Sequence, residues 1–248
     1  MASSFPDPFD PVRRMLRRAV LQALDRAIVA VQREVRREIR ARLRSLAESI
    51  EYVTAVLGRM PHGAANIVAD SFRGPFSRAL TPGEVALIVQ AFGTQPVSPG
   101  DVRIVLGPGD QPLAAAAFIN GNPAITIGNT IYMKPSVYQK LGGRDLSASP
   151  EGVEMLLHEY THVVQYARLG FAVFGKRYAR EFRDSGNDAG KMYDYRSRKL
   201  SYDQEMIEGQ AAIVGDYAQQ MALTPAKQNA ALIQQLRTKL RGTGIFGQ

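Results

Sequence analysis

The stretch Leu156-Leu157-His158-Glu159-Tyr160-Thr161-His162-Val163-Val164 contains His-Glu-x-x-His, the short zinc-binding signature of metallopeptidases. Its flanks predict a helix, because Ser149 and Pro150 suit the first positions, apolar residues recur at helical spacing, and Gly170 suits the end. Residues four apart share one face of a helix, so the two imidazoles can hold one ion. Glu159 lies about 100° further round the helix, beside the position that a catalytic zinc keeps for water.

These residue types fit metal-assisted hydrolysis. Neutral imidazole is a good zinc ligand, the metal makes its water more acidic, and a nearby carboxylate can take the proton. We therefore predict His158 and His162 as zinc ligands and Glu159 as the general base. The plainer interpretation is a buried helix with two core histidines. The chain has three histidines in all, and the third, His62, lies in a Pro- and Gly-flanked turn where we expect a surface residue.

Composition narrows the class of protein. The chain has 248 residues, of which 45% are hydrophobic and 22% charged, which is ordinary for a folded domain. The absence of cysteine excludes disulfides and thiolate ligands, so zinc must be held by histidine and carboxylate. We expect neither a secretory signal peptide nor a transmembrane segment, because charged residues interrupt the best apolar run near the start. The compartment stays unknown, either the cytoplasm or one reached by a non-classical secretion route.

The N-terminal segment is arginine-rich. Residues 11–57 show apolar positions at a period longer than the roughly 3.5 residues of a left-handed coiled coil, which predicts one long helix or two with a break near 41–45. Residues 13–44 hold eleven arginines and three acids, a net charge of 11 − 3 = +8, equal to that of the whole chain. Such a helix could dock an anionic or secretion-system partner or a membrane surface. We favour a solvated face, since few aromatics interleave and no specific nucleic-acid motif is present.

Between this segment and the signature, several short elements are predicted. Residues 61–77 read as a connector with short helical pieces, and Thr81-Pro82-Gly83-Glu84 is a capping box that opens a helix to about position 92. Residues 102–106 suggest a strand, and residues 134–149 a loop with a short helix. Residues 124–133 alternate around Gly128-Asn129, which predicts either a two-residue hairpin or one bulged strand. The resulting strand edge could bind an extended peptide or be purely structural.

A zinc ion held by His158 and His162 requires a third protein ligand. Residues 205–217 are again helical in pattern, and Glu205 and Glu208 share one face. Zinc sites with two histidines often take a carboxylate from a later helix. Small residues at 211 and 212 would let this helix approach the first one closely. We choose Glu208, with Glu205 as the second choice, and Asp216 either orients a ligand or is an ordinary surface acid.

Aromatic residues are frequent in residues 171–200. Those at 171, 174, 178 and 182 have helical spacing and are expected to pack in the core. Tyr193, Tyr195 and Tyr202 are candidates for a phenol that stabilises the oxyanion of a transition state. Further on, Thr224 is expected to cap a last helix from position 225 to about 240.

Five stretches together resemble a known family: LTPGEVALIVQAFG (80–93), VRIV (102–105), AITIGNTIYM (124–133), LLHEYTHVVQY (156–166) and IEGQAAIVGDY (207–217). They are similar to zincin-like HExxH metallopeptidase domains of bacterial Vgr-related proteins, toxins and proteins associated with extracellular contractile injection systems. The resemblance covers about residues 78–220. It implies that His158, His162 and Glu208 bind zinc and that Glu159 is the base. Where the family usually has Glu-Gln-Gln-Ala, this chain has Gly209 in place of the first glutamine, a departure that bears on the rigidity of the site.

We therefore expect an α+β, zincin-like domain at 78–222, mostly helical with a small sheet. It follows an Arg-rich helical segment (1–60) and a connector (61–77) and precedes a C-terminal helix and tail (223–248). The expected function is that of a zinc metalloendopeptidase acting on a protein or peptide, as a toxin or secretion-system effector. The alternative is a non-catalytic zinc-binding module of a secretion or contractile injection system. An open cleft beside Glu159 favours catalysis, and a plugged one favours the module or a latent zymogen.

Overall fold

The computed structural model describes residues 26, 30, 33–34, 46–93, 96–141 and 143–248. Most of the predicted Arg-rich segment therefore lies outside the described residues, and its expected partners remain a prediction. The described α-helices are α2 (Leu46–Leu57), α3 (His62–Asp70), α4 (Pro82–Phe92), α5 (Pro112–Ile119), α6 (Pro135–Lys140), α7 (Pro150–Leu169), α8 (Phe171–Asp184), α9 (Ala189–Tyr193), α10 (Ile207–Ala222) and α11 (Ala230–Leu240). Within the described part, no helix is both long and apolar enough to cross a bilayer.

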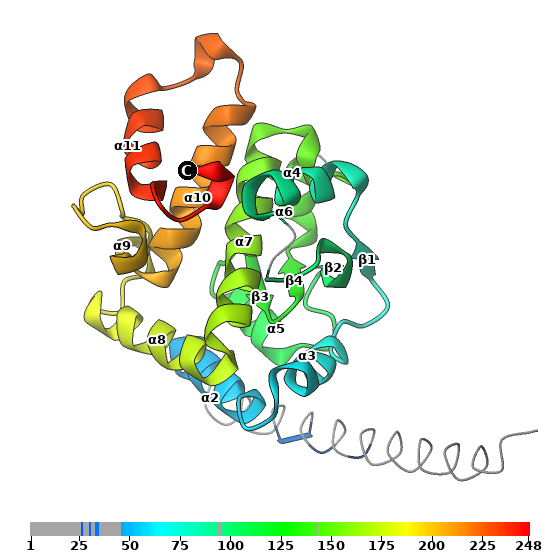
Figure 1. Ribbon diagram of the computed structural model, residues 1–248. Helices are drawn as coiled ribbons and strands as arrows, with labels where there is room; N and C mark the ends of the chain where they lie inside the picture. The colour runs from blue at the N-terminus through cyan, green and yellow to red at the C-terminus, as the bar shows by residue number, and fades with distance from the viewer. Residues whose placement is uncertain (1–25, 27–29, 31–32, 35–45, 94–95, 142) are drawn as a thin grey trace, which may run out of the picture.

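The strands form one small mixed sheet, so the predicted α+β class is confirmed. Strands β1 (Ser77–Ala79), β2 (Arg103–Leu106), β3 (Ala124–Ile127) and β4 (Thr130–Met133) lie in the order β1-β2-β4-β3. The β2–β4 pair is parallel and the other two pairs are antiparallel. The sheet lies on one side of α7, and α10 lies on the other (Figure 1).

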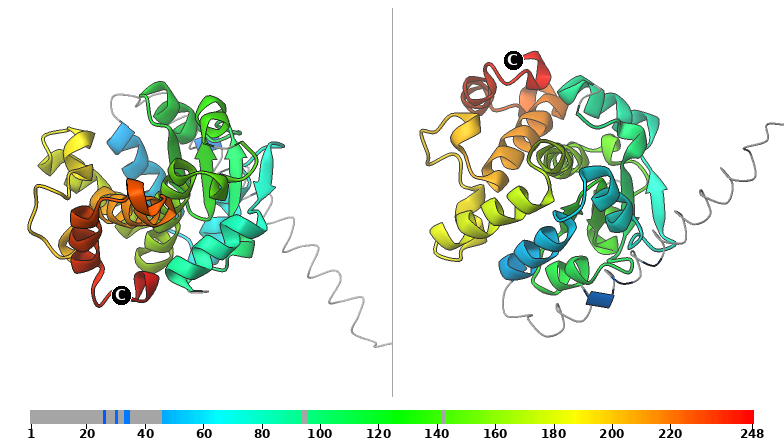
Figure 2. Two further views of the ribbon diagram at one scale, coloured as in Figure 1. Left: turned by 90° about the horizontal axis from the view of Figure 1, so that it is seen from above. Right: turned by 60° about the horizontal axis from the view of Figure 1, so that its bottom comes forward.

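Helix α7 is the central element and begins and ends as predicted. Ser149 caps it by accepting a hydrogen bond from the backbone N–H of Gly152, Pro150 occupies the first turn, and Gly170 ends it. Its flanks are apolar and buried, with Leu156 and Leu157 fully inaccessible. The second view in Figure 2 looks nearly along this helix and shows other elements on all sides of it. A helix in this position can hold polar side chains only where neighbouring elements supply partners.

The sheet separates two apolar clusters, because successive strand residues point to opposite faces. Ile104 and Ile131 belong to the cluster shared with α4, α7, α10 and α11. Val105 and Tyr132 belong to the cluster shared with α2, α3, α5 and α8. The sheet is therefore the middle layer between two groups of helices, and α7 packs on the first face.

The stretch at 124–133 is a hairpin and not a bulged strand. Ile127 pairs with Thr130 across the two-residue turn, and Ala124 pairs with Met133. Residues that flank a two-residue turn exchange hydrogen bonds, and the pattern then alternates along the ladder. The bond from the Lys134 N–H to the Pro123 carbonyl, 3.0 Å long, agrees with this alternation. The backbone N–H and C=O groups of Ala124 and Thr126 therefore point to the outer edge of β3, which is an edge strand.

Several local predictions are confirmed and one is wrong. The capping box of α4 is present, and β2 and α6 lie within the expected ranges. Residues 61–77 contain α3, a helix of nine residues, and α5 was not foreseen. The last helix does not start at 225, because only a short 3₁₀ turn forms there and Thr224 makes no capping bond. Asn229, a stronger cap than threonine, accepts from the N–H of Leu232 and opens α11 instead.

Helices α2 and α8 approach closely at Gly175, where an added Cβ would overlap the side chain of Thr54. We expect Gly175→Ala to lower the free energy of unfolding by about 1–2 kcal/mol, because overpacking costs more than alanine gains over glycine in a helix. Urea denaturation measures the change. Gly63→Ala is the matched control, since nothing lies within 4 Å of a Cβ there. Equal stability of the two variants would contradict this packing.

Candidate metal centre

Helix α7 brings the three residues of the signature to one site. His158, Glu159 and His162 are all buried, at 8%, 5% and 6% exposure. The imidazole centroids lie 5.1 Å apart with their planes nearly perpendicular, as their one-turn separation requires. Two buried imidazoles without partners would be costly, so the neighbouring helices must supply polar groups.

Glu208, in the first turn of α10, is that partner. Its Oε2 lies 3.2 Å from Nε2 of His158 and 3.2 Å from Nε2 of His162. One ligand atom from each of the three residues lies within 4.8 Å of the others, so the cluster could hold a metal ion. Ligand atoms bound to a tetrahedral zinc at about 2.0–2.1 Å lie roughly 3.3 Å apart. The donor set and both carboxylate-to-imidazole distances therefore fit a zinc ion.

The electrostatics hold Glu208 in the state that binds metals. Burial opposes charge on His162, but the charge of Glu208 and its hydrogen bond outweigh this, so the pKa of His162 is raised to about 9. Burial would raise the pKa of Glu208, yet the two imidazoles lower it well below its ordinary value. The buried carboxylate thus stays ionised, as a ligand must be.

Glu205, the second choice, is committed elsewhere. Its fully buried carboxylate accepts from Arg198 and from Lys239, each at 2.7 Å. Both of its oxygens are thus paired with cations, and it makes no hydrogen bond with either imidazole within the described residues. Gly209 faces this ion pair, since a Cβ there would lie 2.9 Å from the Arg198 guanidinium. The glycine thus leaves room for the guanidinium beside the Glu205 carboxylate.

Gln165 fixes the orientation of His162. Its Oε1 lies 2.8 Å from Nδ1 of His162, so the amide oxygen accepts that N–H and leaves Nε2 free to bind a metal. The Gln165 amide donates to the Ile207 carbonyl and to Gln210 Oε1 on α10. Gln165 was part of the family pattern, but no role was assigned to it from the sequence. The signal available in the sequence was its position three residues after His162, which places both side chains on one face of the helix.

We expect Gln165→Leu to weaken zinc affinity by about 10–100-fold, the usual effect of removing a partner that orients a metal-binding histidine. Competition titration against a chromophoric chelator measures the change. The matched variant is Gln210→Leu, which touches Gln165 but not the imidazole and should have a smaller effect. Equal losses in both variants would show that the amide does not act through His162.

Glu159 is held by the sheet and not by the metal cluster. Thr126 of β3 donates to Glu159 Oε2 at 2.7 Å, and its hydroxyl also lies 3.2 Å from the Glu159 carbonyl oxygen. The other carboxylate oxygen, Oε1, has no hydrogen bond to any residue that the structure describes. Glu159 is thus fixed beside the cluster with one oxygen available, as a general base requires.

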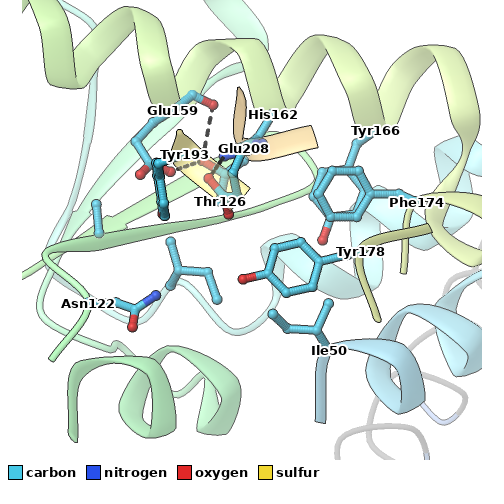
Figure 3. Close-up of a pocket in the computed structure, with 12 residues that line it drawn as sticks. Ile50, Asn122, Thr126, Glu159, His162, Tyr166, Phe174, Tyr178, Tyr193 and Glu208 are labelled. Atoms are coloured by element: carbon cyan, nitrogen blue, oxygen red, sulfur yellow. Dashed lines mark hydrogen bonds and ion pairs between the residues drawn. The ribbon is translucent and has the colours of Figure 1, made fainter. Parts of the chain in front are cut away.

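A small cavity lies beside Glu159, His162 and Glu208 (Figure 3). Its volume is about 30 Å³, enough for one or two waters. Ile50 of α2 and Tyr178 of α8 border it. This side of the site is therefore narrow.

A larger groove of about 540 Å³ opens on the other side, beside His158 and Glu159. It runs between the segment that enters β3 and the segment around α9. Asn122 and Ala124 line both spaces, and so does Tyr193. The groove and the small cavity therefore meet at the candidate base.

The three candidate phenols have different surroundings. Tyr193 stacks on His158, with ring centroids 5.6 Å apart, and burial together with Glu208 raises the pKa of its phenol well above 10. Tyr195 instead donates to Asp216, and Tyr202 borders neither the cavity nor the groove. Tyr178, which was assigned to core packing from the sequence, also has its pKa raised by burial and by Glu208. Tyr193 and Tyr178 are therefore the phenols beside the cluster.

Asp216 makes no hydrogen bond or ion pair with either imidazole within the described part of the chain. Its Oδ2 accepts from Arg196 at 2.6 Å and from the Tyr195 hydroxyl. Its carboxylate therefore anchors the segment that follows α9 against α10. The hypothesis that Asp216 orients a zinc ligand gains no support, and the plainer one, an acid near the surface, fits.

Comparison with protein-family models matches residues 82–170 to the eCIS core domain. The matched segment runs from α4 to the end of α7 and includes the His158-to-His162 signature, while Glu208 lies beyond it. The expected association with extracellular contractile injection systems is thereby supported, and the peptidase character remains a prediction. Neither the curated proteins nor the solved structures gave a significant match.

Proposed function

We propose that this chain is a zinc-dependent peptidase associated with a contractile injection system, whose substrate is a protein or peptide. The observation that carries the proposal is the cluster of His158, His162 and Glu208 with a free carboxylate oxygen of Glu159 beside it. A purely structural site needs no such base next to its ligands. The eCIS core match of residues 82–170 supports the association with the injection system.

Each residue of the site has a separate role in the proposed peptide hydrolysis. A zinc ion held by the cluster would polarise a substrate carbonyl and make water more acidic. Glu159 takes a proton from the attacking water at Oε1 and later delivers it to the leaving amine, while Thr126 holds Oε2. Tyr193 is a neutral phenol at neutral pH, and its raised pKa keeps it so at higher pH, so its hydroxyl can donate to the oxyanion.

The edge of β3 provides a means of aligning a peptide. The outward N–H and C=O groups of Ala124 and Thr126 can pair with an extended backbone, which adds a strand to the sheet. Thr126 is also the residue that holds Glu159. A peptide on this edge would therefore lie directly beside the base.

A second function has its own supporting observation. The cavity beside the cluster is small, and Ile50 of α2 borders it. A site narrowed in this way also fits a non-catalytic zinc module of an injection system, or a latent enzyme that α2 must uncover. The groove beside His158 and Glu159 favours the enzyme, because it leaves the base accessible from the other side.

The test is proteolysis of a mixed peptide library by the zinc-loaded chain, read by mass spectrometry. We expect metal removal by a chelator to reduce cleavage at least about 100-fold, since both carbonyl polarisation and water activation depend on the ion. Added zinc should restore it. Stoichiometric zinc without any cleavage would favour the module, and cleavage that survives complete metal removal would contradict the mechanism.

A further inference from the structure

The groove beside the cluster carries a charge that its own residues do not balance. Its lining includes the carboxylates of Glu154, Glu159, Asp194 and Asp216 and a single guanidinium, that of Arg196. The chain as a whole has the opposite sign, with a net charge of +8. An acidic groove on a basic chain selects for cationic groups.

Each of these carboxylates but one has a partner. Asp216 pairs with Arg196, Asp194 accepts from the N–H of Ser197, and Glu159 accepts from Thr126. Glu154 has no hydrogen bond or ion pair with any residue that the structure describes. It is half-buried on α7, one turn before His158. A carboxylate in this position loses hydration without gaining a partner, which is costly unless a ligand supplies one.

A bound metal ion does not remove this imbalance. The carboxylate of Glu208 in the cluster and that of Glu159 beside it already match the two charges of a divalent ion. Burial raises the pKa of Glu154, the nearby His158 imidazole lowers it, and the neighbouring Asp216 carboxylate raises it again, with a net increase. A cation in the groove would offset both the loss of hydration on burial and the repulsion by Asp216.

The surroundings of Glu154 fit a long side chain with a charged end. The apolar residues Met155, Ala189 and Ala212 line the same groove and can cover a methylene stem. The ring of Tyr193 also borders it and can face a cation. Lysine and arginine combine such a stem with a cationic head, whereas an acidic side chain would be repelled.

We propose that Glu154 is a specificity residue that binds a lysine or arginine side chain of an extended peptide lying in the groove beside β3. This inference rests on the proposed function for its peptide. It concerns binding, so it can be tested whether or not the peptide is cleaved.

The experiment uses the full-length, zinc-loaded chain carrying Glu159→Gln, so that any hydrolysis is suppressed. The probes are blocked, fluorescein-labelled hexaalanine peptides with lysine, norleucine or glutamate at one central position. Fluorescence anisotropy gives the Kd of each. We expect lysine to bind about tenfold tighter than norleucine, the worth of one charge-assisted hydrogen bond, and glutamate to bind most weakly.

Adding Glu154→Gln should bring the lysine-to-norleucine ratio of Kd values close to one, and adding Glu154→Lys should turn the preference towards glutamate. The matched control is Glu151→Gln, an exposed acid in the first turn of the same helix, which should keep the lysine preference. Equal Kd values for lysine and norleucine before any change at Glu154 would overturn the inference. A lysine preference in a chain that never cleaves peptides would support it and contradict only the peptidase proposal.

Discussion

Replacing Glu208 by alanine is expected to weaken zinc binding about a thousandfold or more, beyond the 10–100-fold that follows loss of an orienting partner. Both imidazole Nε2 atoms lie 3.2 Å from one oxygen of this carboxylate. Without it, two neutral imidazoles would have to hold the ion with no anionic ligand. Elemental analysis after dialysis and competition titration with a chelator measure the loss.

The matched control is Glu205→Gln, three residues earlier and fully buried. That change breaks the ion pairs with Arg198 and Lys239, so it should lower the free energy of unfolding by about 3–5 kcal/mol. Zinc affinity should stay within a few-fold of the unmodified chain. If Glu205→Gln released the metal and Glu208→Ala kept it, the assignment of the third ligand would be reversed.

The part of the site that could be predicted from sequence is the part set by local geometry. His158 and His162 share a face because they are one helical turn apart, and the ends of α7 are fixed by Ser149 and Gly170, which are also local. The capping box of α4 was predictable for the same reason. For residues 124–133 the sequence left two forms open, a hairpin and a bulged strand. The pairing of Ile127 with Thr130 in the structure shows that the hairpin forms.

The choice between Glu205 and Glu208 depended on partners far along the chain. The expected helix over residues 205–217 put both on one face, so spacing left them equivalent. In the structure α10 begins at Ile207, and Glu205 lies before it. The difference comes from Lys239 of α11, thirty-four residues after Glu205, which together with Arg198 binds that carboxylate. No local sequence pattern predicts a pairing between residues so far apart along the chain.

The shape of the cleft also could not be predicted from local sequence patterns. Ile50 reaches the small cavity because α2 packs on α8, where Gly175 lies against Thr54. Thr126 meets Glu159 only because β3 lies at the edge of the sheet beside α7. These contacts join segments that are 33 or more residues apart, and they decide whether the site is open.

The second large effect is expected from Glu159→Gln, which should lower the rate of peptide hydrolysis by about 10²–10⁴-fold, the usual contribution of a general acid–base group. Zinc content should be unchanged, because Glu159 is outside the cluster of candidate ligands. Glutamine keeps the size of the side chain and can still meet the Thr126 hydroxyl, but it cannot take a proton from water. Single-turnover hydrolysis of a peptide found in the library screen, with zinc measured on the same sample, gives both numbers.

Thr126→Val separates positioning from proton transfer. It removes the hydroxyl that holds Glu159 Oε2 and keeps the carboxylate, so we expect a loss of about tenfold, the value of one hydrogen bond to a charged group. Equal turnover by the unmodified chain and Glu159→Gln, at equal zinc content, would exclude Glu159 as the base. If that carboxylate is not the base, another group must take the proton from water, and the burial of Glu159 beside the cluster would be explained by a structural role.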